Sequence, residues 1–137
     1  MKNLKLKYFL PVVITIVFVI FFSQLLKKDV TKLSSQLIEK PVPTFNMPTL
    51  LNDNQSFSTI DVIASDIALV NIWSSWCIPC RSEHEILMLL SKIEGIDLYG
   101  INYKDKEDNA LDFINKLGNP FKKIGVDNNG RSSMVWG

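Results

Sequence analysis

The chain opens with one long apolar stretch and then changes to short apolar runs separated by polar turns. Tyr8–Leu26 holds 19 residues without a charge, and three lysines precede it. An uncharged stretch of about 20 residues is long enough to cross a bilayer as a helix. No small-residue cleavage site follows it, because Leu26 runs directly into Lys27 and Lys28. This pattern favours an uncleaved signal anchor over a cleaved signal peptide or a buried core helix.

The remaining apolar runs predict strands. Phe45–Leu50 and Gln55–Phe57 flank a polar turn, which is typical of a hairpin. Ile67–Trp73 is a nearly unbroken apolar run, as expected for a central strand covered on both faces. Ile96–Tyr103 predicts a second strand, and Lys123–Val126 predicts a shorter one.

Two segments between these strands have helical spacing. In Arg81–Ile93, apolar residues recur at intervals of three and four and predict one buried face. That face consists of Ile86, Leu89, Leu90 and Ile93. Lys104–Leu117 predicts a second helix, whose first residues, Lys104–Asp108, are interpreted as a solvated loop and helix start. Its expected buried residues are Ala110, Phe113, Ile114 and Leu117. Arg131–Trp136 begins a further helix or turn.

Strands that alternate with helices indicate an α/β fold with a parallel sheet and right-handed crossovers. The domain organisation that we expect is a cytoplasmic tail at 1–7, a transmembrane signal anchor at 8–26, a linker at 27–40 and a folded domain at 41–137. Open α/β sheets place their chemistry at the carboxyl ends of the strands. Functional residues are therefore expected directly after the apolar runs.

The two cysteines of the chain, Cys77 and Cys80, lie directly after one of these runs. A CxxC pair between a strand and a helix indicates electron transfer between dithiol and disulfide. The helix start carries unpaired N–H groups and a partial positive charge, which favour a thiolate on Cys77. Cys80, about one turn later, is placed to resolve a mixed disulfide. Pro79 suits the first helical turn, where its missing N–H costs nothing.

Other uses of this cysteine pair fit the sequence less well. A structural disulfide rarely closes so small a loop. A zinc site needs two more ligands, but the chain has one histidine and no other cysteine. Haem attachment needs His directly after the second cysteine, where Arg81 stands. Redox exchange is therefore favoured, and it requires no metal or organic cofactor.

Several neighbours of the cysteines are candidates for tuning them. Glu83, one turn after Cys80, is placed to tune its protonation, and the alternative is a solvated glutamate. His84 could tune the thiol or bind metal, but we favour a partly exposed helix residue or a hydrogen bond to the backbone. Trp76 is expected to shield the disulfide and contact partners, and Trp73 is expected in the core.

Charge excludes one class of partner and bears on location. The net charge is +1, but three of the 15 basic residues and none of the 14 acidic residues precede the apolar stretch. The portion after it has no basic stripe, so we expect no nucleic-acid partner. The early lysines favour a cytoplasmic N-terminus, although Lys27 and Lys28 weaken that bias. A tethered redox pair is most useful outside the reducing cytosol, so we expect the folded domain on the exported side.

The segment Val70–His84 resembles the active-site segment of the DsbE/CcmG group of thioredoxin-like proteins, which are thiol:disulfide interchange proteins of cytochrome c biogenesis. Gly100–Asp105, Leu117–Phe121 and Gly125–Gly130 resemble further segments of that group, in the same order. The anchor and Pro41–Phe45 are similar too. The resemblance implies a thioredoxin-like fold, a central sheet flanked by helices.

The resemblance also implies a function. It implies a reductase anchored in the bacterial inner membrane through residues 8–26, with its domain in the periplasm. Its electron donor would be a transmembrane thiol reductase of the DsbD/CcdA type. Its acceptors would be apocytochrome c CxxCH disulfides or cytochrome c maturation proteins. Cys77 would attack, Cys80 would resolve, the two would form the redox-active disulfide, and Glu83 matches the acidic residue near the family's active site.

Asn71 departs from the pattern of ordinary thioredoxin. Asn71 stands where ordinary thioredoxin has a buried aspartate, and the CcmG pattern has asparagine too. An amide cannot accept a proton, so Cys80 would use water or a group such as Glu83.

The family continues past Gly137 with a Gly-Val-x-Gly-x-Pro-Glu-Thr-like segment, two strands and a helix. We therefore expect a C-terminally truncated fold with an unpaired sheet edge and exposed core surface.

Two other functions remain open. One is a general extracytoplasmic thiol-disulfide reductase or oxidase, because direction depends on a reduction potential that residue patterns do not fix. The other is a copper-delivery module using Cys77, Cys80 and His84, since soft thiolates suit Cu(I).

Overall fold

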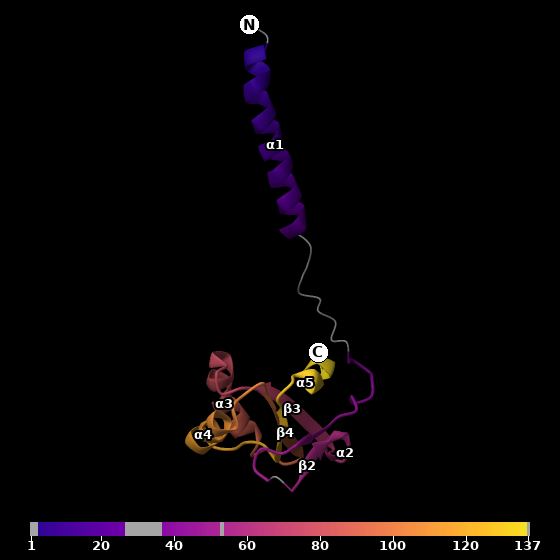
Figure 1. Ribbon diagram of the computed structural model, residues 1–137. Helices are drawn as coiled ribbons and strands as arrows, with labels where there is room; N and C mark the ends of the chain where they lie inside the picture. The colour runs from indigo at the N-terminus through magenta and orange to yellow at the C-terminus, as the bar shows by residue number, and fades with distance from the viewer. Residues whose placement is uncertain (1–2, 27–36, 53, 137) are drawn as a thin grey trace. The chain divides into compact units, whose positions relative to one another are not determined.

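The computed structural model describes residues 3–26, 37–52 and 54–136, in two units, Met1–Ser35 and Gln36–Gly137. The first unit holds α1 (Asn3–Leu26), a single helix that contains the predicted anchor segment (Figure 1). Its large apolar side chains between positions 9 and 22 are exposed. Within the described part of the chain, no helix combines the length and the hydropathy that crossing a membrane requires. Most of the predicted linker, 27–40, lies outside the described residues.

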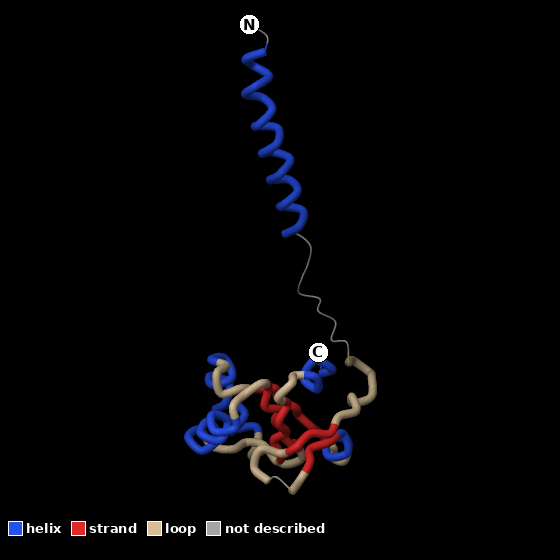
Figure 2. The backbone as a smooth tube through the Cα atoms, viewed as in Figure 1, coloured by secondary structure: helices blue, strands red, loops and turns tan. Residues whose placement is uncertain are grey.

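The second unit is an α/β domain. Its elements are β1 (Asn46–Pro48), β2 (Ser56–Ser58), α2 (Thr59–Ile63), β3 (Ile67–Trp73), α3 (Ile78–Leu90), β4 (Ile96–Tyr103), α4 (Glu107–Leu117), β5 (Lys123–Asp127) and α5 (Arg131–Trp136). The first two strands form the predicted antiparallel hairpin, and the other three pair in parallel in the order β3-β4-β5 (Figure 2). The predicted strands and their parallel pairing are confirmed.

Apolar side chains cover both faces of the three-stranded sheet. On one face, α3 and α4 bury a cluster that includes Trp73, Leu98 and Phe113. On the other face, the hairpin and α2 bury Phe57, Tyr99 and Ile101, among others. Figure 1 shows α3 and α4 together on one side of the strands and α2 on the opposite side. Parallel strands are usually covered in this way, which explains why apolar residues predominate in β3 and β4.

Among the described residues, Ile67–Trp73 lies at an edge of the sheet and not at the predicted central position. Among the described residues β3 pairs only with β4, and β4 occupies the middle of the sheet. Ile67 is 58% exposed, and Leu69 is 37% exposed. An apolar run indicates that a strand has faces to cover, but it does not specify how many neighbours the strand has.

The predicted buried face of the helix after the cysteines is wrong except at Leu90, which is partly buried and packs against the core. Ile86, Leu89 and Ile93 are exposed, whereas α3 buries His84 and Leu87 and packs Cys80 against the core. The rotation of the helix follows from its first turn: once Cys80 faces the sheet, residues four and seven positions later face it too. The core therefore takes a stripe that contains a cysteine and a histidine, and the most apolar stripe lies outside it.

The helix α4 differs from its prediction at both ends. It begins at Glu107 rather than Lys104, because Lys104 has a left-handed backbone with φ 43°. Ala110, Phe113 and Ile114 are buried as predicted, but Leu117 is 38% exposed. Gly118, with φ 93°, follows the last turn, in the conformation that glycine adopts without strain.

Candidate active site

The cysteines lie where β3 passes into α3. Cys77 is the N-cap residue of α3, and Pro79 occupies its first turn. The two cysteines form a disulfide across a Cα–Cα distance of 5.3 Å. The backbone N–H of Cys80 donates to Cys77 Sγ at 3.3 Å. This is the position in which an N-cap side chain accepts a hydrogen bond, so a reduced Cys77 would hold its negative charge against the helix N-terminus.

The three residues before Cys77 are bonded to the end of β4 and to the loop that follows it. Ser74 Oγ donates to the carbonyl of Tyr103 at 2.7 Å. Trp76 Nε1 donates to the carbonyl of Lys104 at 3.2 Å. Ser75 bonds to the carboxylate of Asp105 through both its N–H, at 2.5 Å, and its Oγ, at 2.7 Å. The segment that leads into Cys77 is therefore held at every residue.

The interpretation of Lys104–Asp108 as a simple solvated run is wrong at Asp105. That carboxylate accepts from Ser75, from Asn102 Nδ2 at 3.1 Å and from the N–H of Lys106 at 2.9 Å. Burial would raise the pKa of Asp105, but these hydrogen bonds outweigh it and place the pKa below its ordinary value. The sequence carried one signal for the contact between Ser75 and Asp105. Parallel strands end at the same edge of a sheet, so polar residues after β3 and β4 lie close together.

The other candidate residues lie on β3, on α3 and in the segment between these two elements. Glu83 is exposed on α3, and Trp76, 61% exposed, stands beside the cysteines. Arg81 Nη2 donates to the carbonyl of Ser75 at 3.2 Å, and its guanidinium lies 5.0 Å from the centre of the Phe113 ring. Asn71 is half-buried on β3, level with Gly100 of β4. The roles of Glu83 and Trp76 stay predictions.

His84 belongs to the core. It is 4% exposed, and its Nε2 lies 3.0 Å from the carbonyl of Gly118. Phe113 and Phe121 meet its ring edge to face at 5.0 and 6.5 Å between ring centres. The expected backbone hydrogen bond is confirmed, and the expected partial exposure is wrong. Across the described residues no three His, Cys, Asp or Glu side chains are grouped to hold a metal ion.

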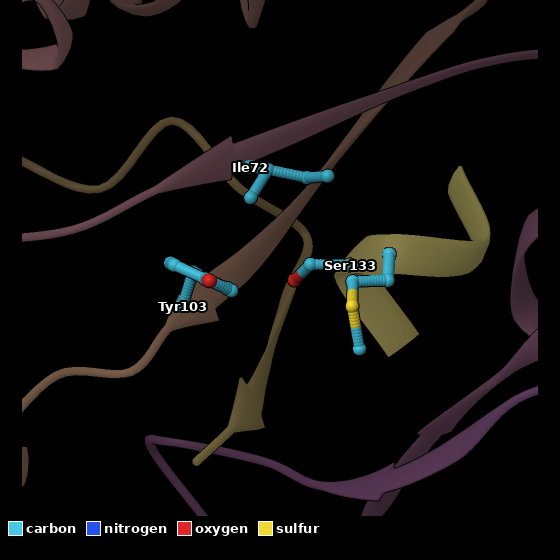
Figure 3. Close-up of a pocket in the computed structure, with 4 residues that line it drawn as sticks. Ile72, Tyr103 and Ser133 are labelled. Atoms are coloured by element: carbon cyan, nitrogen blue, oxygen red, sulfur yellow. The ribbon is translucent and has the colours of Figure 1, made fainter. Parts of the chain in front are cut away.

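An open apolar pocket lies beside the ends of β3 and β4. Ile72, Tyr103, Ser133 and Met134 line it, and its volume is about 260 Å³ (Figure 3). Figure 3 shows the labelled side chains coming from two strands and from α5. Sequence reasoning missed it, because Ile72 was expected to be covered and it is 36% exposed.

Two kinds of comparison with known proteins agree on the class to which this fold and site belong. Residues 38–137 match the family model described as Redoxin. A secreted Mycobacterium tuberculosis disulfide oxidoreductase homologous to Escherichia coli DsbE matches with a TM-score of 0.59 at 19% identity, over 68% of this chain and 67% of that one. A secreted thiol-disulfide isomerase from Corynebacterium glutamicum matches with a TM-score of 0.54 at 26% identity, over 70% and 60%. The fold is thioredoxin-like.

Curated relatives narrow the class. The thiol:disulfide interchange protein DsbE of Allochromatium vinosum is 36% identical over 82% of this chain and 61% of its own length. CycY of Rhizobium leguminosarum is 48% identical over 55% and 40%. The probable DsbE-2 of Pasteurella multocida is 38% identical over 94% and 67%. The chain thus belongs to the Redoxin family and, within it, to the DsbE group of thiol:disulfide interchange proteins. It spans between 40% and 67% of the length of these three relatives.

Proposed function

We propose that the chain is a thiol:disulfide oxidoreductase that reduces disulfides in cytochrome c maturation. The observation that carries this proposal is the Cys77–Cys80 disulfide at the N-terminus of α3, with Cys77 as the N-cap residue. A thiolate at this position is stabilised by the helix and remains a nucleophile near neutral pH. The names of the curated relatives support the reaction class.

The exchange proceeds in two steps. The Cys77 thiolate attacks one sulfur of a substrate disulfide, forms a mixed disulfide and releases the other sulfur as a thiolate that takes up a proton. The Cys80 thiol then loses its proton and attacks Cys77 Sγ, which releases the second substrate thiol and forms the Cys77–Cys80 disulfide. The substrate gains two electrons and two protons, and a dithiol donor restores the protein in the reverse sense.

The proposal includes a location and partners. The uncharged stretch Tyr8–Leu26 would anchor the chain in the bacterial inner membrane, with the thioredoxin-like domain in the periplasm. The donor would be a transmembrane thiol reductase of the DsbD/CcdA type. The acceptors would be apocytochrome c CxxCH disulfides or cytochrome c maturation proteins, as the resemblance of the motifs implies. Neither exchange step requires a metal or an organic cofactor.

Single cysteine variants of the full chain test the mechanism. Incubated with an oxidised CxxCH peptide, Cys77→Ser is expected to form no adduct, and Cys80→Ser is expected to accumulate the mixed disulfide, because its resolving thiol is absent. Ser82→Ala, on the exposed part of α3, is the matched control and turns over like the wild type. Mass spectrometry of the trapped species reads the outcome. An adduct on Cys80 in place of Cys77 contradicts the assignment.

Direction and location need separate measurements. Equilibration with glutathione gives the reduction potential, where a difference of about 30 mV corresponds to 1.4 kcal/mol for two electrons. A potential more negative than that of the glutathione pool supports the reductant, and a more positive one favours a general oxidase on this fold. In cells, a membrane-impermeant maleimide is expected to label reduced Cys77 from outside the inner membrane. Labelling only after lysis contradicts the periplasmic location.

A further inference from the structure

The segment before Cys77 and the loop after β4 are joined residue by residue. Ser74, Ser75 and Trp76 bond to Tyr103, Asp105 and Lys104 respectively. We propose that Asp105 is a positioning residue for the redox reaction: its carboxylate holds Ser75, and Ser75 holds Cys77 in place at the N-terminus of α3. This inference rests on the proposed function, because it concerns the reactivity of the same thiol.

Asp105 and Ser75 are joined by two hydrogen bonds, an arrangement that we call the Asp105 clamp. Each of its carboxylate oxygens accepts one hydrogen bond from Ser75: Oδ2 from the N–H at 2.5 Å and Oδ1 from Oγ at 2.7 Å. Asn102 Nδ2 occupies a further position on Oδ2, and the N–H of Lys106 occupies one on Oδ1. The four donors use the approximate capacity of an ionised carboxylate, so the side chain has little freedom to rotate.

The loop that carries Asp105 is itself held by the third strand. The N–H of Lys104 donates to the carbonyl of Asp127, the last residue of β5, at 3.0 Å. Lys104 adopts φ 43°, and its aliphatic chain lies so close to Gly130 that a Cβ there would come within 2.6 Å of Lys104 Cε. A left-handed lysine persists only where the surroundings enforce it. The backbone next to Asp105 is thus held in place by β5 and by the turn that follows it.

Ser75 transmits this restraint to the helix. While its N–H and Oγ face Asp105, its carbonyl accepts from Arg81 Nη2 at 3.2 Å, and Arg81 belongs to the second turn of α3. Two residues further on, Cys77 Sγ accepts the N–H of Cys80. If Ser75 is released, the bonds of Ser74 and Trp76 remain, but Cys77 is held less firmly in the position in which the helix N-terminus stabilises its thiolate.

The sign of the expected change in the pKa of Cys77 distinguishes a positioning role of Asp105 from a purely electrostatic one. Removal of a nearby negative charge, with nothing moved, lowers the pKa of a thiol. Displacement of the thiol from the helix N-terminus raises its pKa and slows its exchange. The other charged side chains around the clamp, Arg81, Lys104 and Lys106, are unchanged in the variant and contribute equally to both measurements.

The experiment compares Asp105→Asn with Asp61→Asn in the full chain. Asn cannot accept both bonds from Ser75, because one of its two terminal atoms is a donor. Asp61 also accepts hydrogen bonds from a serine N–H and Oγ, those of Ser58, but these bonds do not involve the segment that leads into Cys77. For reduced protein, the rate of iodoacetamide alkylation of Cys77 against pH gives the thiol pKa, and exchange with an oxidised CxxCH peptide gives reactivity.

We expect Asp105→Asn to raise the pKa of Cys77 and to slow exchange roughly tenfold to hundredfold, the usual effect of misplacing a reacting group. Asp61→Asn should leave both unchanged. A Cys77 pKa in Asp105→Asn that is equal to or below that of the wild type overturns the inference. Should this variant not fold, Ser75→Ala against Ser82→Ala decides it by the same sign. A wild-type chain that does not exchange overturns the proposed function itself.

Discussion

At the scale of single residues, His84 shows how a side chain chosen as a chemical candidate acts in packing. Its ring lies between Phe113 and Phe121, and its Nε2 bonds the carbonyl of Gly118 just after α4. Since this bond joins the CxxC helix to the next helix, His84 contributes to holding α3 against the core. It points to a structural role and gives the copper hypothesis no third ligand.

We expect His84→Ala to lower the free energy of unfolding by about 2–4 kcal/mol, because it leaves a cavity and removes the partner of a partly buried carbonyl. Glu83→Ala is the matched control, since Glu83 is the exposed neighbour on the same helix and should change stability by no more than about 0.5 kcal/mol. Urea unfolding followed by tryptophan fluorescence measures both. Equal stability of the two variants would contradict the packing role.

Asp61 makes a contribution to stability that depends on pH, and it lies outside the segment of the cysteines. Burial would raise the pKa of its carboxyl, but bonds from Lys123 and Ser58 lower it below the ordinary value of 3.8. A lowered folded-state pKa stabilises the protein above the unfolded-state value, and this stability is lost as pH falls through the folded-state value. Asp61→Asn should therefore be less stable than the wild type at neutral pH, and the difference should shrink below about pH 3.8.

Thermal unfolding at neutral pH and at pH near 3 measures that difference for Asp61. Asp112→Asn is the control, because its pair with Lys116 is exposed and exposed pairs contribute about 0–1 kcal/mol. A deficit of Asp61→Asn that persists undiminished in acid would show that the carboxylate charge is not what stabilises the folded state.

At the scale of elements, the hairpin attaches to β5 through a close approach. Gly125 forms an isolated bridge with Thr49, and a Cβ on Gly125 would overlap the side chains of Met47 and Phe57. We expect Gly125→Ala to destabilise the protein by about 1–3 kcal/mol through overpacking. Met47→Ala removes part of the obstruction, so the double variant should be more stable than the sum of the two single effects by roughly 0.5–3 kcal/mol.

Denaturant unfolding of the four members of this cycle gives the coupling energy between Gly125 and Met47. Gly95→Ala is the control for the glycine, because nothing lies within 4 Å of a Cβ there and its cost arises from φ 86° alone. It should be additive with Met47→Ala. Additivity at Gly125 as well would contradict the close approach of β1 to β5.

The elements that the sequence predicted correctly are those whose pattern is local. The bounds of Ile67–Trp73 and Ile96–Tyr103 were predictable because apolar runs ended at polar residues or glycines. The rotation of α3 was not, because the helix carries more apolar residues than the core can take, and Cys80 decides which stripe faces inward. The Asp105 clamp was missed for a similar reason, since its partner Ser75 lies 30 residues earlier.

At the scale of the whole molecule, strand order is what the sequence could not supply. An apolar run is expected of any parallel strand with covered faces, so nothing in Ile67–Trp73 distinguishes an edge strand from a central one. The parallel register then brings Ser75 and Asp105 to one end of the sheet, and this placement creates the site. The cysteines were predictable from spacing, whereas their support depends on which strand neighbours which.

Amide hydrogen exchange tests this strand order directly. β4 is paired on both sides, whereas β3 is paired only with β4 among the described residues. In a parallel strand, successive N–H groups point to alternate sides, so roughly half of the β3 amides should exchange rapidly while the interior of β4 is the most protected. NMR at two protein concentrations measures this. Uniform protection along β3 would show that its outer edge is covered, and concentration dependence of that protection would identify a second copy of the chain as the cover.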